Sequence, residues 1–173
     1  MEGARCVLVV DDDQGVRETF AYVLTLAGYT VQIAATAEEA LRCVGQDRPD
    51  AILVDLKMPL INGAGFLFRL RKNPANRDIA VAVITAAPVL DEETIDDLRT
   101  LRAQIWHKPL SIEDIQQIAR ALVADAPASA ASTVDHRPAP AAPAIHVAGP
   151  SLDRCVTRDA RGQNTRGLPP RRE

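Results

Sequence analysis

The sequence predicts a doubly wound α/β fold, in which a five-stranded parallel sheet carries helices on both faces. Three observations support this prediction. Over residues 1–125, five short aliphatic runs alternate strictly with five amphipathic stretches, and the loops between them are short. Most of the aliphatic runs are hydrophobic at nearly every position, which is typical of parallel strands that are covered on both faces.

The predicted strands are these aliphatic runs, each bounded by polar residues. They cover residues 6–10, 30–34, 51–54, 79–84 and 104–107. Because an amphipathic stretch rather than a tight turn follows each run, we expect consecutive strands to be parallel and joined by right-handed crossovers.

The predicted helices follow from apolar residues at a period near 3.6 and from the residues at the helix ends. They cover residues 14–27, 36–46, 65–72, 91–102 and 111–124. The first ends before Gly28, a typical helix C-terminal glycine. The second begins with Thr36 and carries Glu39 three positions later, which forms a capping box.

The composition changes near residue 125. Residues 1–125 hold 13 basic and 19 acidic side chains, whereas residues 126–173 hold 7 and 4, together with 7 of the 12 prolines. The second segment shows no sustained strand or helix period. Ordering a backbone costs on the order of 1–2 kcal/mol per residue, and this segment has too little apolar surface to offset that cost. We therefore expect a folded domain at 1–125 and a disordered, basic, Ala/Pro-rich tail at 126–173.

Length and charge exclude several classes of protein. The chain has 173 residues and a net charge of −3; the length fits one domain, and the charge argues against a nucleic-acid partner. It has no apolar run of roughly 18 residues and no signal-peptide pattern at its start, so we expect a cytoplasmic protein without a membrane partner. Neither a disulfide framework nor a zinc site is indicated by its three widely separated cysteines, Cys6, Cys43 and Cys155.

Polar residues follow four of the five predicted strands. The residues at these four strand ends are the acidic run 11–13, Asp55, Thr85 and Lys108. In an open α/β sheet, ligands bind beyond the carboxyl ends of the strands. If the strands before 11–13, Asp55 and Thr85 are neighbours, these residues converge on one edge, with Lys108 beside them.

Three carboxylates in one place repel each other unless a cation joins them. A site made of oxygen ligands without His or Cys favours Mg²⁺, which leaves room for a phosphate oxygen. Asp55 is then the candidate nucleophile. The metal and Lys108 neutralise a transferring phosphoryl group, and the Thr85 hydroxyl donates to one of its oxygens.

These residues, in this order, resemble the receiver domain of bacterial two-component response regulators. The resemblance covers about residues 4–124. It rests on five motifs: LVVDDD from residue 8, LVDLKMP from residue 53, NG at 62–63, VITA from residue 83 and HKP from residue 107. It implies a flavodoxin-like sheet with strand order 2-1-3-4-5. It also implies a stand-alone signalling module, similar to chemotaxis regulators, that acts on an output protein not identified by the sequence.

The resemblance also assigns roles. It implies that Asp55 accepts a phosphoryl group from a histidine kinase or phosphotransfer protein, so the chain is a signalling phosphoacceptor rather than a conventional enzyme. It implies a Mg²⁺ site formed by Asp11, Asp12, Asp55 and the backbone carbonyl of Lys57.

Two further residues receive roles from the same resemblance. Thr85 is the expected switch hydroxyl, and Lys108, followed by a cis Pro109, is the expected ion-pair partner of the acyl phosphate. One position departs from the family, because Ile105 stands where an aromatic switch residue is usual, three positions before Lys108. Strand alternation puts Ile105 on the face opposite Trp106. We expect Ile105 to take part in a contact with a partner or with a second copy of the chain, on the face formed by the last two helices and the last strand.

Three alternatives remain open from the sequence alone. The acidic run 11–13 can cap the following helix, and Asp13 is the residue most readily explained in this way. Asp11 and Asp13 also match the Asp-x-Asp pattern of aspartate-nucleophile phosphohydrolases. The third alternative is a transcriptional regulator that lacks its DNA-binding domain, although no helix-turn-helix pattern follows residue 125.

Overall fold

The computed structural model describes residues 4–125, 145–147 and 156–158 of the 173-residue chain. Its centre is a parallel sheet with the strand order β2-β1-β3-β4-β5, as predicted. The strands are β1 (Cys6–Val10), β2 (Thr30–Ala34), β3 (Ala51–Asp55), β4 (Ala80–Thr85) and β5 (Ala103–His107). The helices are α1 (Gln14–Leu26), α2 (Ala37–Gln46), α3 (Gly63–Lys72), α4 (Glu92–Thr100) and α5 (Ile112–Asp125), with a 3₁₀ turn, η1 (Pro74–Asn76), after α3.

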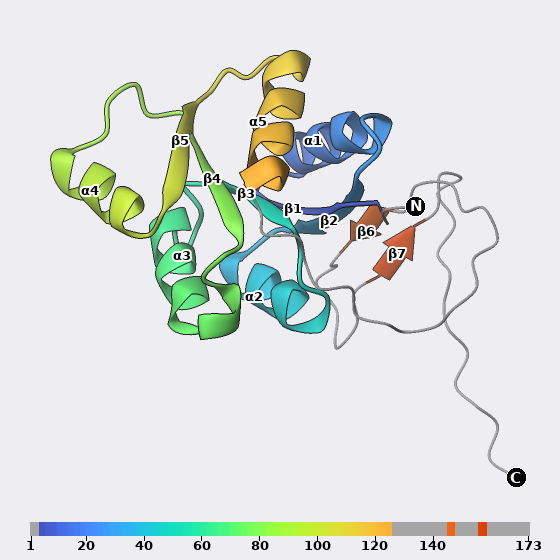
Figure 1. Cartoon of the computed structure of the whole chain (residues 1–173). Coiled ribbons are helices and arrows are strands. Elements are labelled where there is room, and N and C mark those ends of the chain that lie inside the picture. The colour runs from blue at the N-terminus through green and yellow to red at the C-terminus, as the bar shows by residue number, and fades with distance from the viewer. Residues whose placement is uncertain (1–3, 126–144, 148–155, 159–173) are drawn as a thin grey trace, which may run out of the picture.

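The helices cover the sheet in two layers, as the doubly wound prediction requires. Figure 1 shows α1 and α5 together on one face of the sheet and α2 and α3 on the other. Each layer has its own buried aliphatic cluster. One joins α1 and α5 to the sheet, and the other joins α2, α3 and Leu98 of α4 to it. Strands β1 to β4 are buried on both faces, which explains why their sequences are almost continuously apolar, whereas the edge strand β5 is only partly buried.

The strand register brings the carboxyl ends of three neighbouring strands to one edge. Val10 pairs with Val54, Asp55 pairs with Ile84, and Thr85 pairs with His107. Four residues therefore lie near one another: Asp11 after β1, Asp55 at the end of β3, Thr85 at the end of β4 and Lys108 after β5. Asp55 and Thr85 are the last residues of their strands, one position beyond the predicted ends, within the usual uncertainty of strand boundaries.

Helix ends follow the predicted capping chemistry. The Asp13 side chain accepts a hydrogen bond from the Val16 N–H at 3.0 Å and caps α1. Thr36 accepts from the Glu39 N–H, as the predicted capping box requires. The Glu39 carboxylate accepts from the Ala35 N–H, one residue before the N-cap, rather than from the Thr36 N–H that a capping box uses. Gly28 adopts a φ of 92° after α1, a conformation that favours glycine.

Two short strands extend the sheet beyond β2. The segment β6 (Ile145–Val147) pairs in parallel with β2, and β7 (Val156–Arg158) pairs antiparallel with β6. The sequence predicted no strand in this region, because three-residue strands leave no recognisable period. The rest of the predicted tail, residues 126–144, 148–155 and 159–173, lies outside the described residues. Among the described helices, none combines the length and apolar character needed to cross a membrane.

Candidate functional site

The centre of the candidate site is a lysine that joins two buried carboxylates. Lys108 follows β5, and its Nζ donates to Asp11 Oδ2 at 3.0 Å and to Asp55 Oδ1 at 2.7 Å. Asp11 and Asp55 are only 5% and 7% exposed. The structure thus brings together three predicted site residues that are far apart in the sequence, and it gives Lys108 a partner on each of two neighbouring strands.

The remaining carboxylate oxygens accept backbone N–H groups. Asp11 Oδ1 accepts from the Asp13 N–H at 2.9 Å, and Asp55 Oδ2 accepts from the Lys57 N–H at 2.7 Å. Each carboxylate is therefore fixed in orientation by one backbone donor and by the Lys108 ammonium. Fixed acceptors and donors of this kind need little rearrangement when charge develops beside them.

Burial and charge change the acidities at this centre. Burial raises the pKa of Asp11, and the charge of Asp55 acts in the same direction, while the hydrogen bonds from Asp13 and Lys108 oppose them. For Lys108, burial acts to lower the pKa, but the hydrogen bonds and ion pairs with Asp55 and Asp11 outweigh burial and raise it overall. Lys108 therefore remains a cation at neutral pH. With both carboxylates ionised, one ammonium leaves the buried group with net negative charge.

Thr85 lies at the end of β4, beside this group, and is 1% exposed. Its Oγ1 accepts from the Ala87 N–H at 3.0 Å, and its backbone carbonyl accepts from the Lys108 N–H at 2.7 Å. The hydroxyl thus holds the start of the β4–α4 loop, and the main chain of Thr85 fixes the position of Lys108. The Lys108–Pro109 peptide is cis, as the resemblance implied.

The other members of the predicted metal set lie at the surface of the same edge. Asp12 and Lys57 are exposed, and both line a cavity of about 860 Å³ that extends to the start of α4. Asp13 is also exposed, and its side chain caps α1, as the sequence analysis favoured for this residue.

Gly63 is a site residue whose importance sequence reasoning missed. A Cβ atom at this position would lie 2.6 Å from the backbone oxygen of Asp55 and 3.1 Å from the Cα of Leu56. The Gly63 N–H also donates to the Leu56 carbonyl at 2.9 Å. Asn62 caps α3 by accepting from the Gly65 N–H at 2.8 Å. The Asn-Gly pair was noticed as a motif, but the close backbone contact beneath Asp55 needs the folded loop to be seen.

The chemistry of these groups fits Mg²⁺, although the protein ligands are few. Within the described part of the chain, no three His, Cys, Asp or Glu side chains gather closely enough to form a metal site on their own. Asp11 and Asp55 offer carboxylate oxygens, with Asp12 at the rim and the Lys57 carbonyl close to Asp55 in the sequence. Mg²⁺ is usually bound by one or two carboxylates and keeps several waters, so a small set of oxygen donors is what this ion needs.

Ile105 lies near the middle of β5, on the face that strand alternation predicted. It is half-buried and packs against the cluster that includes Leu98 of α4, whereas Trp106 packs against the cluster of α1 and α5. The predicted opposition of these two side chains is confirmed. Ile105 therefore lies at the boundary between the core and the surface formed by α4, β5 and α5.

The sheet order, the strand-end residues and the joined carboxylates define a class of protein. Residues 7–120 match the family described as the response regulator receiver domain. The chain belongs to this family, and its described domain is a receiver domain of two-component response regulators.

Individual relatives are consistent with this assignment. The chain is 35% identical over 117 residues to "Response regulator MprA" of Mycobacterium ulcerans (strain Agy99), and the match covers 68% of this chain and 49% of that protein. The corresponding protein of Mycobacterium tuberculosis (strain ATCC 25177 / H37Ra) is 34% identical over the same length. The chain thus spans about half the length of the curated relatives it matches.

Solved structures share the fold. The chemotaxis protein CheY4 of Vibrio cholerae superposes with a TM-score of 0.64 at 26% identity, covering 69% of this chain and 99% of that one. A CheY-like receiver domain protein of Methanospirillum hungatei JF-1 superposes with a TM-score of 0.64 at 25% identity, covering 71% of this chain and 97% of the other.

Proposed function

We propose that the chain is a phosphorylatable receiver module in which Asp55 takes a phosphoryl group from a phosphohistidine of a histidine kinase or phosphotransfer protein. The observation that carries this proposal is the position of the Lys108 ammonium, 2.7 Å from Asp55 and 3.0 Å from Asp11 at the carboxyl edge of the sheet. A nucleophilic carboxylate beside a fixed cation is suited to accepting a group that brings negative charge.

In the proposed step, one carboxylate oxygen of Asp55 attacks the phosphorus atom. A P–O bond forms as the P–N bond of the phosphohistidine breaks, and the leaving imidazole takes up a proton. Lys108 stabilises the charge on the acyl phosphate oxygens, and the Thr85 hydroxyl donates to one of them. The groups that would hold Mg²⁺ are the carboxylates of Asp11, Asp12 and Asp55 and the backbone carbonyl of Lys57. When bound, the ion would neutralise charge on the phosphoryl group.

The same proposal gives Thr85 a signalling role. Its hydroxyl oxygen now accepts from the Ala87 N–H. If rotation of the side chain carries Thr85 Oγ1 toward a phosphoryl oxygen, the Ala87 N–H loses this acceptor and the loop that leads to α4 changes. We propose that this change alters the α4–β5–α5 surface around Ile105 and favours binding of an output protein or a second copy of the chain.

Intact mass spectrometry tests the phosphoacceptor. Treatment with acetyl phosphate and Mg²⁺ should add one phosphoryl group to the full chain, and the adduct should be absent in Asp55→Asn and in the presence of EDTA. The matched control is Asp13→Asn, because asparagine is also a good N-cap and Asp13 does not touch Asp55. That variant should be phosphorylated like the wild type. An adduct that persists in Asp55→Asn would overturn the assignment.

The phosphohydrolase alternative makes the opposite prediction for Asp13. It needs both Asp11 and Asp13 for turnover of a chromogenic phosphate ester, whereas a receiver shows no steady turnover. The structure supports the receiver proposal more strongly, because the Asp13 carboxylate is already used to cap α1.

The self-association version of the output proposal has its own test. Light scattering with and without beryllium fluoride, a phosphoryl mimic, should show a larger particle for the wild type and a monomer for Ile105→Asp. A monomer in every condition would reject self-association through this surface.

A further inference from the structure

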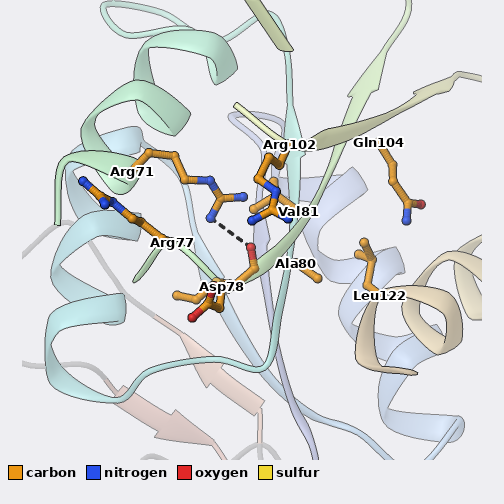
Figure 2. A pocket seen from close by; sticks show the side chains of 9 residues that line it. Arg71, Arg77, Asp78, Ala80, Val81, Arg102, Gln104 and Leu122 are labelled. Carbon is orange, nitrogen blue, oxygen red and sulfur yellow. Dashed lines mark hydrogen bonds between the residues drawn. The ribbon is translucent and has the colours of Figure 1, made fainter. Parts of the chain in front are cut away.

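A second polar cavity lies at the opposite end of the sheet from Asp55. It has a volume of about 280 Å³ and is lined by the start of β4 and by Arg71, Arg77, Arg102, Asp78, Gln104 and Leu122 (Figure 2). We call it the basic cavity. Ala80 lines it and Thr85 ends the same strand, so the two sites are separated by about 16 Å along β4.

The charges around the basic cavity are unbalanced. Three arginines but only one acidic residue, Asp78, are among the described residues that line it, and Figure 2 shows the Arg77 guanidinium pointing away from those of Arg71 and Arg102. Arg77 and Arg102 are exposed, and neither side chain has a hydrogen bond or an ion pair with any described residue. The folded domain is otherwise acidic, since residues 1–125 carry 13 basic and 19 acidic side chains. A local excess of cations in an acidic domain therefore needs an explanation other than general surface charge.

Arg71 is fixed in place by the main chain. Its Nε donates to the Leu101 carbonyl at 3.0 Å, and its Nη1 donates to the carbonyls of Asn76 at 2.8 Å and Ile79 at 2.9 Å. Nη2 has no acceptor within the described part of the chain. Burial lowers the pKa of Arg71, the charge of Arg102 lowers it further, and Asp78 opposes both. The Arg71 guanidinium is thus held rigidly beside a second cation, with free donors left over.

Arg102 occupies a position that favours glycine. It directly follows the C-cap of α4, Leu101, and adopts a φ of 58°. A side chain in this left-handed region is disfavoured, and helices commonly place glycine there. Figure 2 shows the guanidinium groups of Arg71 and Arg102 turned toward each other. The strained backbone at Arg102 therefore carries a side chain that adds positive charge to the cavity. A backbone outlier of this kind is a reason to look for a functional role.

We propose that the basic cavity is a binding site for a small anion that carries a phosphate or diphosphate group. Planar guanidinium groups present paired N–H donors that match phosphate oxygens, so the facing groups of Arg71 and Arg102 can both donate to one such group. The exposed Arg77 side chain has no partner among the described residues and can rotate to join them. The cavity volume lies near the lower end of the roughly 300–1,000 Å³ range of small-molecule sites, so a small ligand fits better than a macromolecule. This inference does not depend on phosphorylation of Asp55.

Amide NMR of the full ¹⁵N-labelled chain tests the proposal with inorganic pyrophosphate as the probe. Mg²⁺ is left out, so that the carboxylates around Asp55 repel the anion. Amides of residues 77–81 and 102–104 should shift along a saturable curve, with a dissociation constant of about 1 mM or tighter at low salt. Arg77→Gln and Arg102→Gln should each weaken binding at least about tenfold.

Three controls make the result decisive. Arg69→Gln removes an exposed arginine from the same helix as Arg71 without touching the cavity, and it should bind pyrophosphate like the wild type. Succinate should bind more weakly than pyrophosphate if the site selects phosphate. Shifts that do not saturate, shifts that persist in both cavity variants, or equal affinity for succinate would each overturn the proposal. Arg102→Gly should keep the fold and lose pyrophosphate, which separates binding from stability.

Discussion

Replacing Gly63 with alanine should damage both the stability of the domain and the geometry of its candidate phosphoacceptor. The added Cβ would lie 2.6 Å from the Asp55 backbone oxygen, and real Cβ contacts are essentially never shorter than 3.0 Å, so the main chain must move by at least 0.4 Å. Both nearest groups are backbone and cannot rotate away. Overpacking of this kind costs about 1–3 kcal/mol, partly offset by the better helix propensity of alanine, up to about 1 kcal/mol. We expect a net loss of about 1–2 kcal/mol.

Gly45 supplies the matched control. It lies near the end of α2, and a Cβ there meets no atom within 4 Å. Gly45→Ala should therefore stabilise the chain by about 0.5–1 kcal/mol. Urea unfolding measures both variants, and the rate of phosphorylation by acetyl phosphate reports on Asp55. Only Gly63→Ala should be slow. If Gly63→Ala is as stable as Gly45→Ala, the reasoning from backbone contact is wrong.

Three further predictions use other parts of the molecule. Folding raises the pKa of Asp11 above 3.8, so the folded chain holds this proton more tightly than the unfolded chain, and stability falls as the pH rises through the folded pKa. In Mg²⁺-free buffer at neutral pH, Asp11→Asn should therefore raise the free energy of unfolding by about 1 kcal/mol and make it depend less on pH. A free energy of unfolding below that of the wild type would contradict this prediction. Thr36→Ala removes the cap that accepts the Glu39 N–H and should cost about 1 kcal/mol in urea unfolding, with no change in phosphorylation. Cutting after Asp125 should leave the thermal midpoint nearly unchanged, because β6 and β7 are three residues each; a drop of many degrees would show that the tail stabilises the receiver.

The fold was accessible from sequence because its signals are local. A buried parallel strand must be apolar along its length, and each crossover helix carries a periodic stripe, so both can be recognised without knowing the partners. The convergence of Asp11, Asp55 and Lys108 then follows from strand order, since residues at the carboxyl ends of neighbouring strands share one edge. The hydrogen bonds that orient each carboxylate do not follow, because they depend on the paths of the loops.

The features that were missed depend on contacts between distant segments or on unusual backbone angles. Arg71, Arg77 and Arg102 come from three separate segments, and no spacing rule links them. Arg102 was assigned to the end of a helix at 91–102, whereas α4 ends at Thr100 and Arg102 has left-handed backbone angles. A sequence pattern predicts where a helix ends from residue preferences alone. Arginine is not a residue that those preferences place in a left-handed conformation, so the pattern extended the helix to include it.

The loop after β4 offers a route for the proposed signal that needs no aromatic residue at position 105. The backbone of Ala87 is held on both sides: its N–H donates to Thr85 Oγ1 at 3.0 Å, and its carbonyl lies 3.1 Å from His107 Nδ1. For the second contact to be a hydrogen bond, Nδ1 must carry the proton. If the Thr85 hydroxyl turns toward a phosphoryl oxygen, Ala87 keeps only the contact with His107, one residue before Lys108. The loop to α4 would then pivot on β5, and the movement would reach the surface beside Ile105 through the main chain rather than through rotation of a ring.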